Sequence, residues 1–206
     1  MLHYETIDPH TLELLKRLQS LPLLQDTRLV GGTSLALQIG HRKSVDIDLF
    51  GKIECDDDEL YEHLKSAGQV TTLKKSPNIH IYTIDGIKVD IVNYKYDWLL
   101  PAIKEDNITL ASKEDIAAMK INAIIGRGTK KDFIDVAYLL QQYTLSEILR
   151  FYFRKYPDAS IFLASKSLAY YDDAEDDPMP FMFTQATWED LKAYISSQYD
   201  EYEANY

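Results

Sequence analysis

The spacing of apolar residues changes once along this chain, near Pro101, and that change limits the folds available to it. Before Pro101, short segments alternate apolar and polar residues, which is typical of strands that bury one face. After Pro101, apolar residues recur every three to four positions, which is typical of amphipathic helices. The sequence therefore predicts α+β (mixed α/β) organisation, with a strand-rich part followed by a helical part.

The strand-rich part is predicted to hold strands at 28–30, 45–50, 70–73, 79–84 and 87–93, with helices at 11–21, 33–39 and 56–67. Asp85 and Gly86 predict a two-residue hairpin turn, and Thr11 is the expected cap of the first helix. The helical part is predicted to hold helices at 113–125, 130–143, 145–156, 160–170 and 187–206. We expect one domain at 1–108 and a helical C-terminal domain at 109–206.

Composition restricts the cellular compartment that we expect for this protein. Cys55 is the single cysteine among 206 residues, so no internal disulfide can form and no second thiolate is present for a zinc site. No apolar stretch approaches the roughly 18 residues that a membrane span needs, and the N-terminus lacks a basic stretch followed by an apolar run. We expect a protein of the reducing cytoplasm with no signal peptide and no membrane partner.

Charge is distributed unevenly. The net charge is −11, and residues 157–206 hold eleven acidic and two basic residues, so that this end carries most of the excess. Proteins that bind long nucleic acids usually present a basic surface. Three interpretations stay open: the partner is not a long nucleic acid, a local basic patch binds it, or the acidic end meets a basic partner.

A glycine pair separates the first predicted strand from the helix that follows. Gly31 and Gly32 allow a tight turn and a close approach of the backbone to a ligand, and Thr33 and Ser34 open the helix. The free N–H groups and positive dipole end of a helix N-terminus suit a phosphate group. The alternative is a turn that binds no ligand, which is the more common role of an isolated Gly-Gly pair.

Two acidic residues alternate with apolar ones in the predicted strand 45–50. Asp46 and Asp48 then share one face of the strand, while Val45 and its apolar neighbours at alternate positions point to the core. Adjacent carboxylates repel each other, and a divalent cation neutralises them. Mg²⁺ suits such a site because it takes few carboxylates together with water and substrate phosphates. The alternative is a solvated strand face.

A third carboxylate follows on a later strand. Asp90 lies between Val89 and Ile91, so it points away from the core if those two residues face inward. If the strand 87–93 neighbours the strand 45–50, Asp90 joins the other two aspartates. Three carboxylates on adjacent strands can hold two metal ions, one for the attacking oxygen and one for a triphosphate. A solvated face is again the alternative.

The order of these elements is similar to that of the polymerase-β-like nucleotidyltransferases. Residues 30–50 read VGGTSLALQIGHRKSVDIDLF and resemble the first motif of AbiEii-type nucleotidyltransferases, a family that includes toxins of bacterial toxin–antitoxin and phage-abortive systems. Asp115, Lys120 and Ala123 resemble the family's third motif in their spacing, and residues 127–135 resemble the fourth. The resemblance implies a polymerase-β-like core with a mixed sheet, followed by helices.

The later motifs add three charged candidates. Lys120 can reach a triphosphate as a point charge, or it is an exposed helix lysine whose stem covers apolar surface. Asp132 and Asp135 share a helix face, where one of them orients the acceptor hydroxyl or acts as a base, and the resemblance favours Asp135. Alternatively, Asp132 is a helix-start residue, and the two aspartates pair with Lys131 or Arg127.

The candidates fall into three groups. The expected metal ligands are Asp46, Asp48 and Asp90. The expected catalytic residues are Asp46, Asp48, Asp90, Lys120, Asp132 and Asp135. The expected nucleotide-binding residues are Gly31, Gly32, Thr33, Ser34, Arg42, Ser44, Lys120 and Arg127. For Arg42, an ion pair with Asp48 and a phosphate contact are both open.

The resemblance implies Mg²⁺-dependent transfer of a nucleotide from an NTP to a hydroxyl acceptor. It also implies a tRNA end as one acceptor and an antitoxin or regulator protein as a partner. Two other hypotheses stay open. One is transfer to a small molecule, as in antibiotic nucleotidyltransferases, or to a protein hydroxyl. The other is a binding module that keeps the fold without turnover and uses its acidic end as the functional surface.

Overall fold

The computed structural model describes residues 1–205, and the chain forms two compact units. The strand unit comprises Met1–Lys95 and Ala102–Ala111, and the helical unit comprises Tyr96–Pro101 and Ser112–Tyr206. The strand unit is thus built from two separate segments, unlike the continuous domains 1–108 and 109–206 expected from the sequence. That division into domains stays a prediction.

The strand unit contains a seven-stranded mixed sheet in the order β3-β4-β5-β2-β1-β7-β6. Its strands are β1 (Thr27–Leu29), β2 (Ile47–Gly51), β3 (Val70–Lys75), β4 (Ile79–Ile84), β5 (Ile87–Asn93), β6 (Ile103–Glu105) and β7 (Ile108–Leu110). The sequence did not predict β6 and β7, because a three-residue strand is too short to show an alternation. Asp106 and Asn107 join them with positive φ angles of 51° and 63°, as a tight hairpin turn requires.

The helices of this unit are α1 (Pro9–Ser20), α2 (Gly31–Ile39) and α3 (Asp57–Leu64), with short 3₁₀ turns at Tyr4–Thr6 and Pro22–Leu24. Asp8, and not Thr11, caps α1: its carboxylate accepts a hydrogen bond from the backbone N–H of His10 at 2.9 Å. Pro9 occupies the first turn, where its fixed φ suits a helix start. The predicted cap was therefore wrong, and Thr11 lies buried inside the helix.

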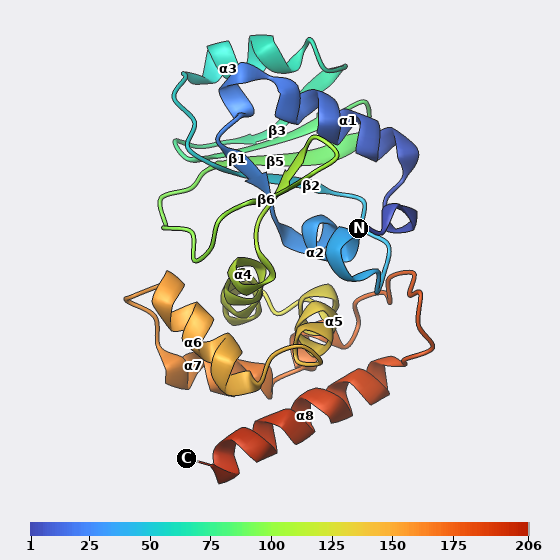
Figure 1. Cartoon of the computed structure of the whole chain (residues 1–206), viewed down its shortest axis with the longest axis vertical. Helices are drawn as coiled ribbons and strands as arrows, with labels where there is room; N and C mark the ends of the chain where they lie inside the picture. The colour runs from blue at the N-terminus through green and yellow to red at the C-terminus, as the bar shows by residue number, and fades with distance from the viewer. Residues whose placement is uncertain (206) are drawn as a thin grey trace. The chain divides into compact units, whose positions relative to one another are not determined.

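The core of the strand unit lies on one face of the sheet. Figure 1 shows α1 and α3 on the same side of it, and the buried residues include Leu14, Leu15, Leu18, Leu60, Leu64, Ile47, Leu49, Val89 and Ile91. Ile47 and Leu49 in β2 alternate with Asp48, which therefore points to the opposite face. Val45 is 58% exposed and precedes the strand, so the expectation that it faces the core was wrong.

The helical unit consists of α4 (Lys113–Gly126), α5 (Lys130–Leu139), α6 (Leu145–Lys155), α7 (Ile161–Leu168) and α8 (Trp188–Ala204), with a 3₁₀ turn at Asp172–Ala174. Helix α4 packs against α5, α6 and α7. Hydroxyl groups start several of these helices: Ser112 caps α4, and Thr144 and Thr187 form capping boxes with Glu147 and Asp190. Among the described helices, none combines the length and the apolar character that crossing a membrane requires.

A buried ion pair holds the segment Tyr96–Pro101 within the helical unit. The Lys155 ammonium lies 2.6 Å from Asp115 Oδ1 and donates to the carbonyl of Asp97 at 3.0 Å. The backbone N–H groups of Leu99 and Leu100 donate to the two oxygens of the same Asp115 carboxylate, at 2.9 and 3.3 Å. Both charged side chains are fully buried, so each depends on the other for compensation of its charge.

Candidate functional site

Asp48 and Asp90 are direct neighbours in the sheet. Strands β2 and β5 pair in parallel, and their register places Asp48 opposite Asp90. Residues opposite each other in a parallel pair project from the same face, and both carboxylates point away from the face that carries Ile47 and Val89. Both side chains are half-buried. The two strands are therefore neighbours, which is the condition under which Asp90 joins Asp48.

Lys88 supplies positive charge beside this pair. It lies two residues before Asp90 on β5, and its ammonium is 2.7 Å from Asp90 Oδ1. Partial burial opposes the charged form of Lys88, but the contact with Asp90 and the attraction of Asp90, Asp48 and Asp46 outweigh it and raise the pKa of the ammonium. Lys88 therefore stays charged and offsets part of the repulsion between the aspartates.

The glycine pair lies against the side chains of this site. Gly31 has φ = +67°, and a Cβ atom built on it would collide with Oδ2 of Asp48 and lie 3.1 Å from Cγ. A Cβ atom on Gly32 would collide with Nη2 of Arg42 and lie 3.3 Å from Oγ of Ser44. The two glycines therefore make room for the protein's own carboxylate and guanidinium.

Hydroxyl groups tie the start of α2 to the segment before β2, which contains Asp46, so the prediction that Asp46 lies within the strand was wrong. The Thr33 hydroxyl bonds to Ser44 Oγ at 2.8 Å and donates to the backbone carbonyl of Asp46. Ser34 is fully buried, and its Oγ accepts a hydrogen bond from Gln38 at 3.2 Å. The buried guanidinium of Arg42 donates to the Lys43 carbonyl at 3.0 Å. The predicted residues of the first motif are thus brought together, with the hydroxyls of Thr33 and Ser34 used inside the protein.

The chemistry of the pair Asp48 and Asp90 fits a divalent cation, because half-buried carboxylates side by side require a positive charge. In residues 1–205, however, no three or more His, Cys, Asp or Glu side chains form a group that could hold a metal ion. The trio that includes Asp46 is therefore not preassembled as a metal cage, and the ammonium of Lys88 lies beside Asp90.

The helical unit contains a second charged cluster around Lys120. The ammonium lies 2.9 Å from Asp132 Oδ1 and 2.6 Å from Asp135 Oδ2. The side chain of Lys120 is 7% exposed and those of the two aspartates at most 1%. The alternative of an exposed helix lysine was therefore wrong, because α4 packs against α5 on the face that carries Lys120.

Asp132 has further partners. Arg127 donates to it through Nε at 3.0 Å and Nη2 at 3.3 Å, and the Thr129 hydroxyl donates at 2.7 Å. Burial favours the neutral acid, but Lys120 and Arg127 outweigh it and lower the pKa of Asp132 to about 2. The ion pair between Asp132 and Arg127, which the sequence analysis gave as an alternative, is present. The Arg127 side chain is 66% exposed, so its guanidinium also faces solvent.

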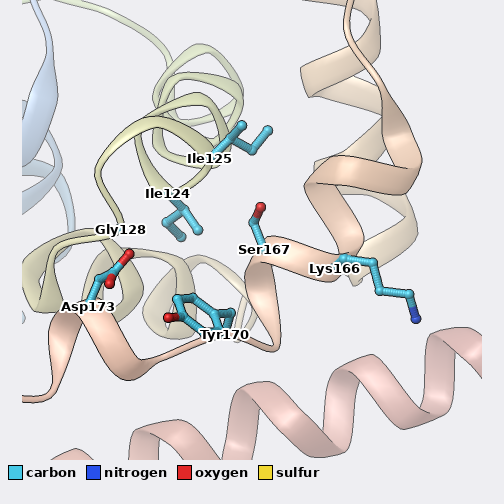
Figure 2. Close-up of a pocket in the computed structure, with 7 residues that line it drawn as sticks. All are labelled: Ile124, Ile125, Gly128, Lys166, Ser167, Tyr170 and Asp173. Atoms are coloured by element: carbon cyan, nitrogen blue, oxygen red, sulfur yellow. The ribbon is translucent and has the colours of Figure 1, made fainter.

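A small cavity of about 240 Å³ lies elsewhere in the helical unit, lined by Ile124, Ile125, Gly128, Lys166, Ser167, Tyr170 and Asp173. Figure 2 shows Lys166 extending away from the two isoleucines, and its ammonium lies 3.0 Å from the hydroxyl of Tyr199. None of the predicted site residues lines this cavity. It is also smaller than the roughly 300–1,000 Å³ typical of small-molecule sites, so we do not assign it to a nucleotide.

Lys88 is a residue of this site that is absent from the catalytic and binding candidates predicted from the sequence. The available signal was its position two residues before Asp90 in a predicted strand, which places both side chains on one face. The pairing of Asp115 with Lys155 was not predicted, because the two residues lie 40 positions apart and meet only when their helices pack.

Known proteins resemble this chain in sequence and in fold. An uncharacterized protein of Aquifex aeolicus (strain VF5) is 32% identical over 199 residues, covering 94% of this chain and 96% of its own length. Two solved structures share the fold at low sequence identity. JHP933 from Helicobacter pylori matches with a TM-score of 0.57 and 18% identity, covering 95% of this chain and 91% of its own.

The second structure is MenT4, a nucleotidyltransferase toxin from Mycobacterium tuberculosis H37Rv. It matches with a TM-score of 0.60 and 15% identity, covering 91% of this chain and 79% of its own. The family model described as nucleotidyl transferase AbiEii toxin of type IV toxin–antitoxin systems matches residues 13–202, which include every candidate residue above. This chain therefore belongs to the AbiEii nucleotidyl transferase toxin family and is a nucleotidyltransferase.

Proposed function

We propose that this enzyme transfers a nucleotide from an NTP to a hydroxyl acceptor with Mg²⁺. The observation that carries the proposal is the register of Asp48 opposite Asp90 on parallel strands. Together with Asp46, these carboxylates would hold the metal, which in such enzymes neutralises triphosphate charge and activates the attacking oxygen. Membership of the family supports a nucleotide substrate and an antitoxin partner.

The protein's own residues have distinct proposed roles. Gly31 and Gly32 keep the backbone of the first turn of α2 close to Asp48 and Arg42, so that a phosphate can approach the start of this helix. Lys120 is proposed to contact the triphosphate, Arg127 to contact the nucleotide, and Asp135 to orient or deprotonate the acceptor hydroxyl. These three lie in the helical unit.

The acceptor that we propose first is a tRNA end, which rests on the family resemblance. Net charge works against this acceptor, since the chain carries −11 and phosphate contacts need basic residues. Burial also removes candidates for such contacts: Lys130 is 6% exposed, and its ammonium donates to the carbonyls of Glu175 and Asp177 at 2.9 and 2.6 Å. The same negative charge favours a second candidate, a cationic small-molecule acceptor.

We further propose that the enzyme is the toxin of a bacterial toxin–antitoxin or abortive-infection pair and works in the cytoplasm. Family membership supports the first point, and the NTP substrate and single cysteine support the second. The segment 157–206, which holds eleven acidic residues, suits a basic partner protein.

The test is a labelling assay with each of the four NTPs, Mg²⁺ and three acceptor classes: total tRNA, aminoglycoside-type cations and bacterial protein. The wild-type chain is expected to label one class, and Asp48→Asn and Asp90→Asn are expected to lose at least about 100-fold in rate. Glu13→Gln, an exposed change on α1, is the matched control and retains the rate. Binding of NTP and Mg²⁺ without labelling of any acceptor would instead support a non-catalytic module.

A further inference from the structure

The acidic site carries its own cation. The Lys88 ammonium lies 2.7 Å from Asp90, and Asp90 is in register with Asp48. We propose that Lys88 is a resident counter-ion which a metal–nucleoside triphosphate complex displaces from Asp90 and which then binds the phosphates. The proposal rests on the proposed function, because it concerns the same site.

The position of Lys88 follows from strand geometry. Residues two apart on a strand share a face, so Lys88 and Asp90 project together from β5 beside Asp48. Two carboxylates opposite each other on adjacent strands destabilise a sheet unless a positive charge lies between or beside them. Lys88 supplies that charge within the strand unit, and a bound divalent cation would supply the same charge in its place.

The exposure of Lys88 makes this exchange physically reasonable. Its side chain is 41% exposed, whereas the side chain of Lys120 is 7% exposed and that of Lys155 is fully buried. Lys120 and Lys155 are therefore held in place by packing. Lys88 has a flexible four-carbon stem, and an ion pair with solvent access is weak. Lys88 can exchange partners without disrupting the core.

The exchange favours metal that arrives with the nucleotide. A free divalent cation must compete with the ammonium for Asp90 and leaves Lys88 without an anion. A metal–triphosphate complex also takes the carboxylates but brings phosphate oxygens, which give the ammonium a new partner. Lys88 should therefore weaken the binding of metal alone and strengthen the binding of the complex.

The experiment measures these two affinities separately by calorimetry on the full chain, with Mn²⁺ alone and with Mn²⁺ bound to a non-hydrolysable NTP analogue. Lys88→Met is expected to bind Mn²⁺ alone about fivefold more tightly and the complex about fivefold more weakly, as expected for the loss of one exposed ion pair. Lys88→Arg keeps the charge and is expected to behave like the wild type.

The matched control is Lys104→Met, which removes one positive charge from exposed β6, separated from β5 in the sheet by β2, β1 and β7. It is expected to change neither affinity more than twofold. Thermal unfolding of each variant checks the fold, and Lys88→Gln is a second neutral variant that replaces Lys88→Met if the latter unfolds.

The outcomes separate the two proposals. If the wild type binds the complex and transfers nucleotide, but neither neutral variant binds free Mn²⁺ more tightly, the counter-ion role of Lys88 is overturned and the proposed function stands. If the wild type binds neither Mn²⁺ nor the complex and labels no acceptor, both proposals are overturned. Opposite shifts of the two affinities in Lys88→Met support the exchange.

Discussion

A Cβ atom on Gly31 would collide with the carboxylate of Asp48, although the two residues lie 17 positions apart. Glycine at this position therefore does more than satisfy a turn, because it lets the backbone at the start of α2 touch a proposed metal ligand. Its φ of +67° is a second reason for glycine at this position, since residues that carry a Cβ atom rarely adopt that conformation.

We predict that Gly31→Ala loses at least about 100-fold in transfer rate, because a displacement of about 1 Å in a catalytic carboxylate is that costly. Gly86→Ala is the matched control: Gly86 has φ = +81°, and a Cβ atom added there would meet no atom within 4 Å. Both variants should lose about 1–2 kcal/mol of stability from the backbone conformation. Equal rates in the two variants would contradict the role given to the Asp48 contact.

Lys120 allows a test that separates stability from catalysis. We predict that Lys120→Met costs about 3–5 kcal/mol in urea unfolding, because two buried aspartates lose their shared cation. Adding Asp135→Asn should recover part of that stability. Transfer should stay low in the double variant if Lys120 and Asp135 act on substrates. Lys131→Met, on the exposed face of α5, should change stability by less than about 0.5 kcal/mol.

Asp132 makes stability depend on pH in the acid range. Its pKa is about 2 in the folded chain against an ordinary value of 3.8, so it adds stability above pH 3.8 that is lost as the pH falls through about 2. The difference corresponds to about 2 kcal/mol. Urea unfolding between pH 2 and 6 should show the wild type and Asp132→Asn converging at the acid end. Parallel curves would exclude this contribution.

The pair Lys155 and Asp115 should be a structural requirement of the helical unit. We predict that Lys155→Met alone costs about 3–5 kcal/mol, because it leaves the buried Asp115 carboxylate without its cation. Lys155→Met combined with Asp115→Asn should cost clearly less, since the amide oxygen still accepts from Leu99 and carries no charge. Chemical unfolding measures both variants. A double variant less stable than the single one would show that the pairing is not the reason for Asp115.

Several features of the candidate site could be read from local sequence. The alternation around Asp48 and Asp90 predicted which face each aspartate takes, and the strand register confirms it. The Asp85-Gly86 turn was also predicted correctly. These features depend on residues within about one helical turn or one strand, so a short window of sequence contains the relevant interactions.

By itself, then, the sequence determined the helices and the longer strands, the position of the glycine pair and the face of the sheet that Asp48 and Asp90 take. Only the tertiary structure decided that Asp48 meets Asp90, that Lys88 stands beside them and that Lys120 is buried between two aspartates. The burial of Lys120 and the pairing of Asp115 with Lys155 depend on helix packing across many intervening residues. Residue spacing fixes the direction of a side chain, whereas its partners and its burial are set by segments far away in the chain.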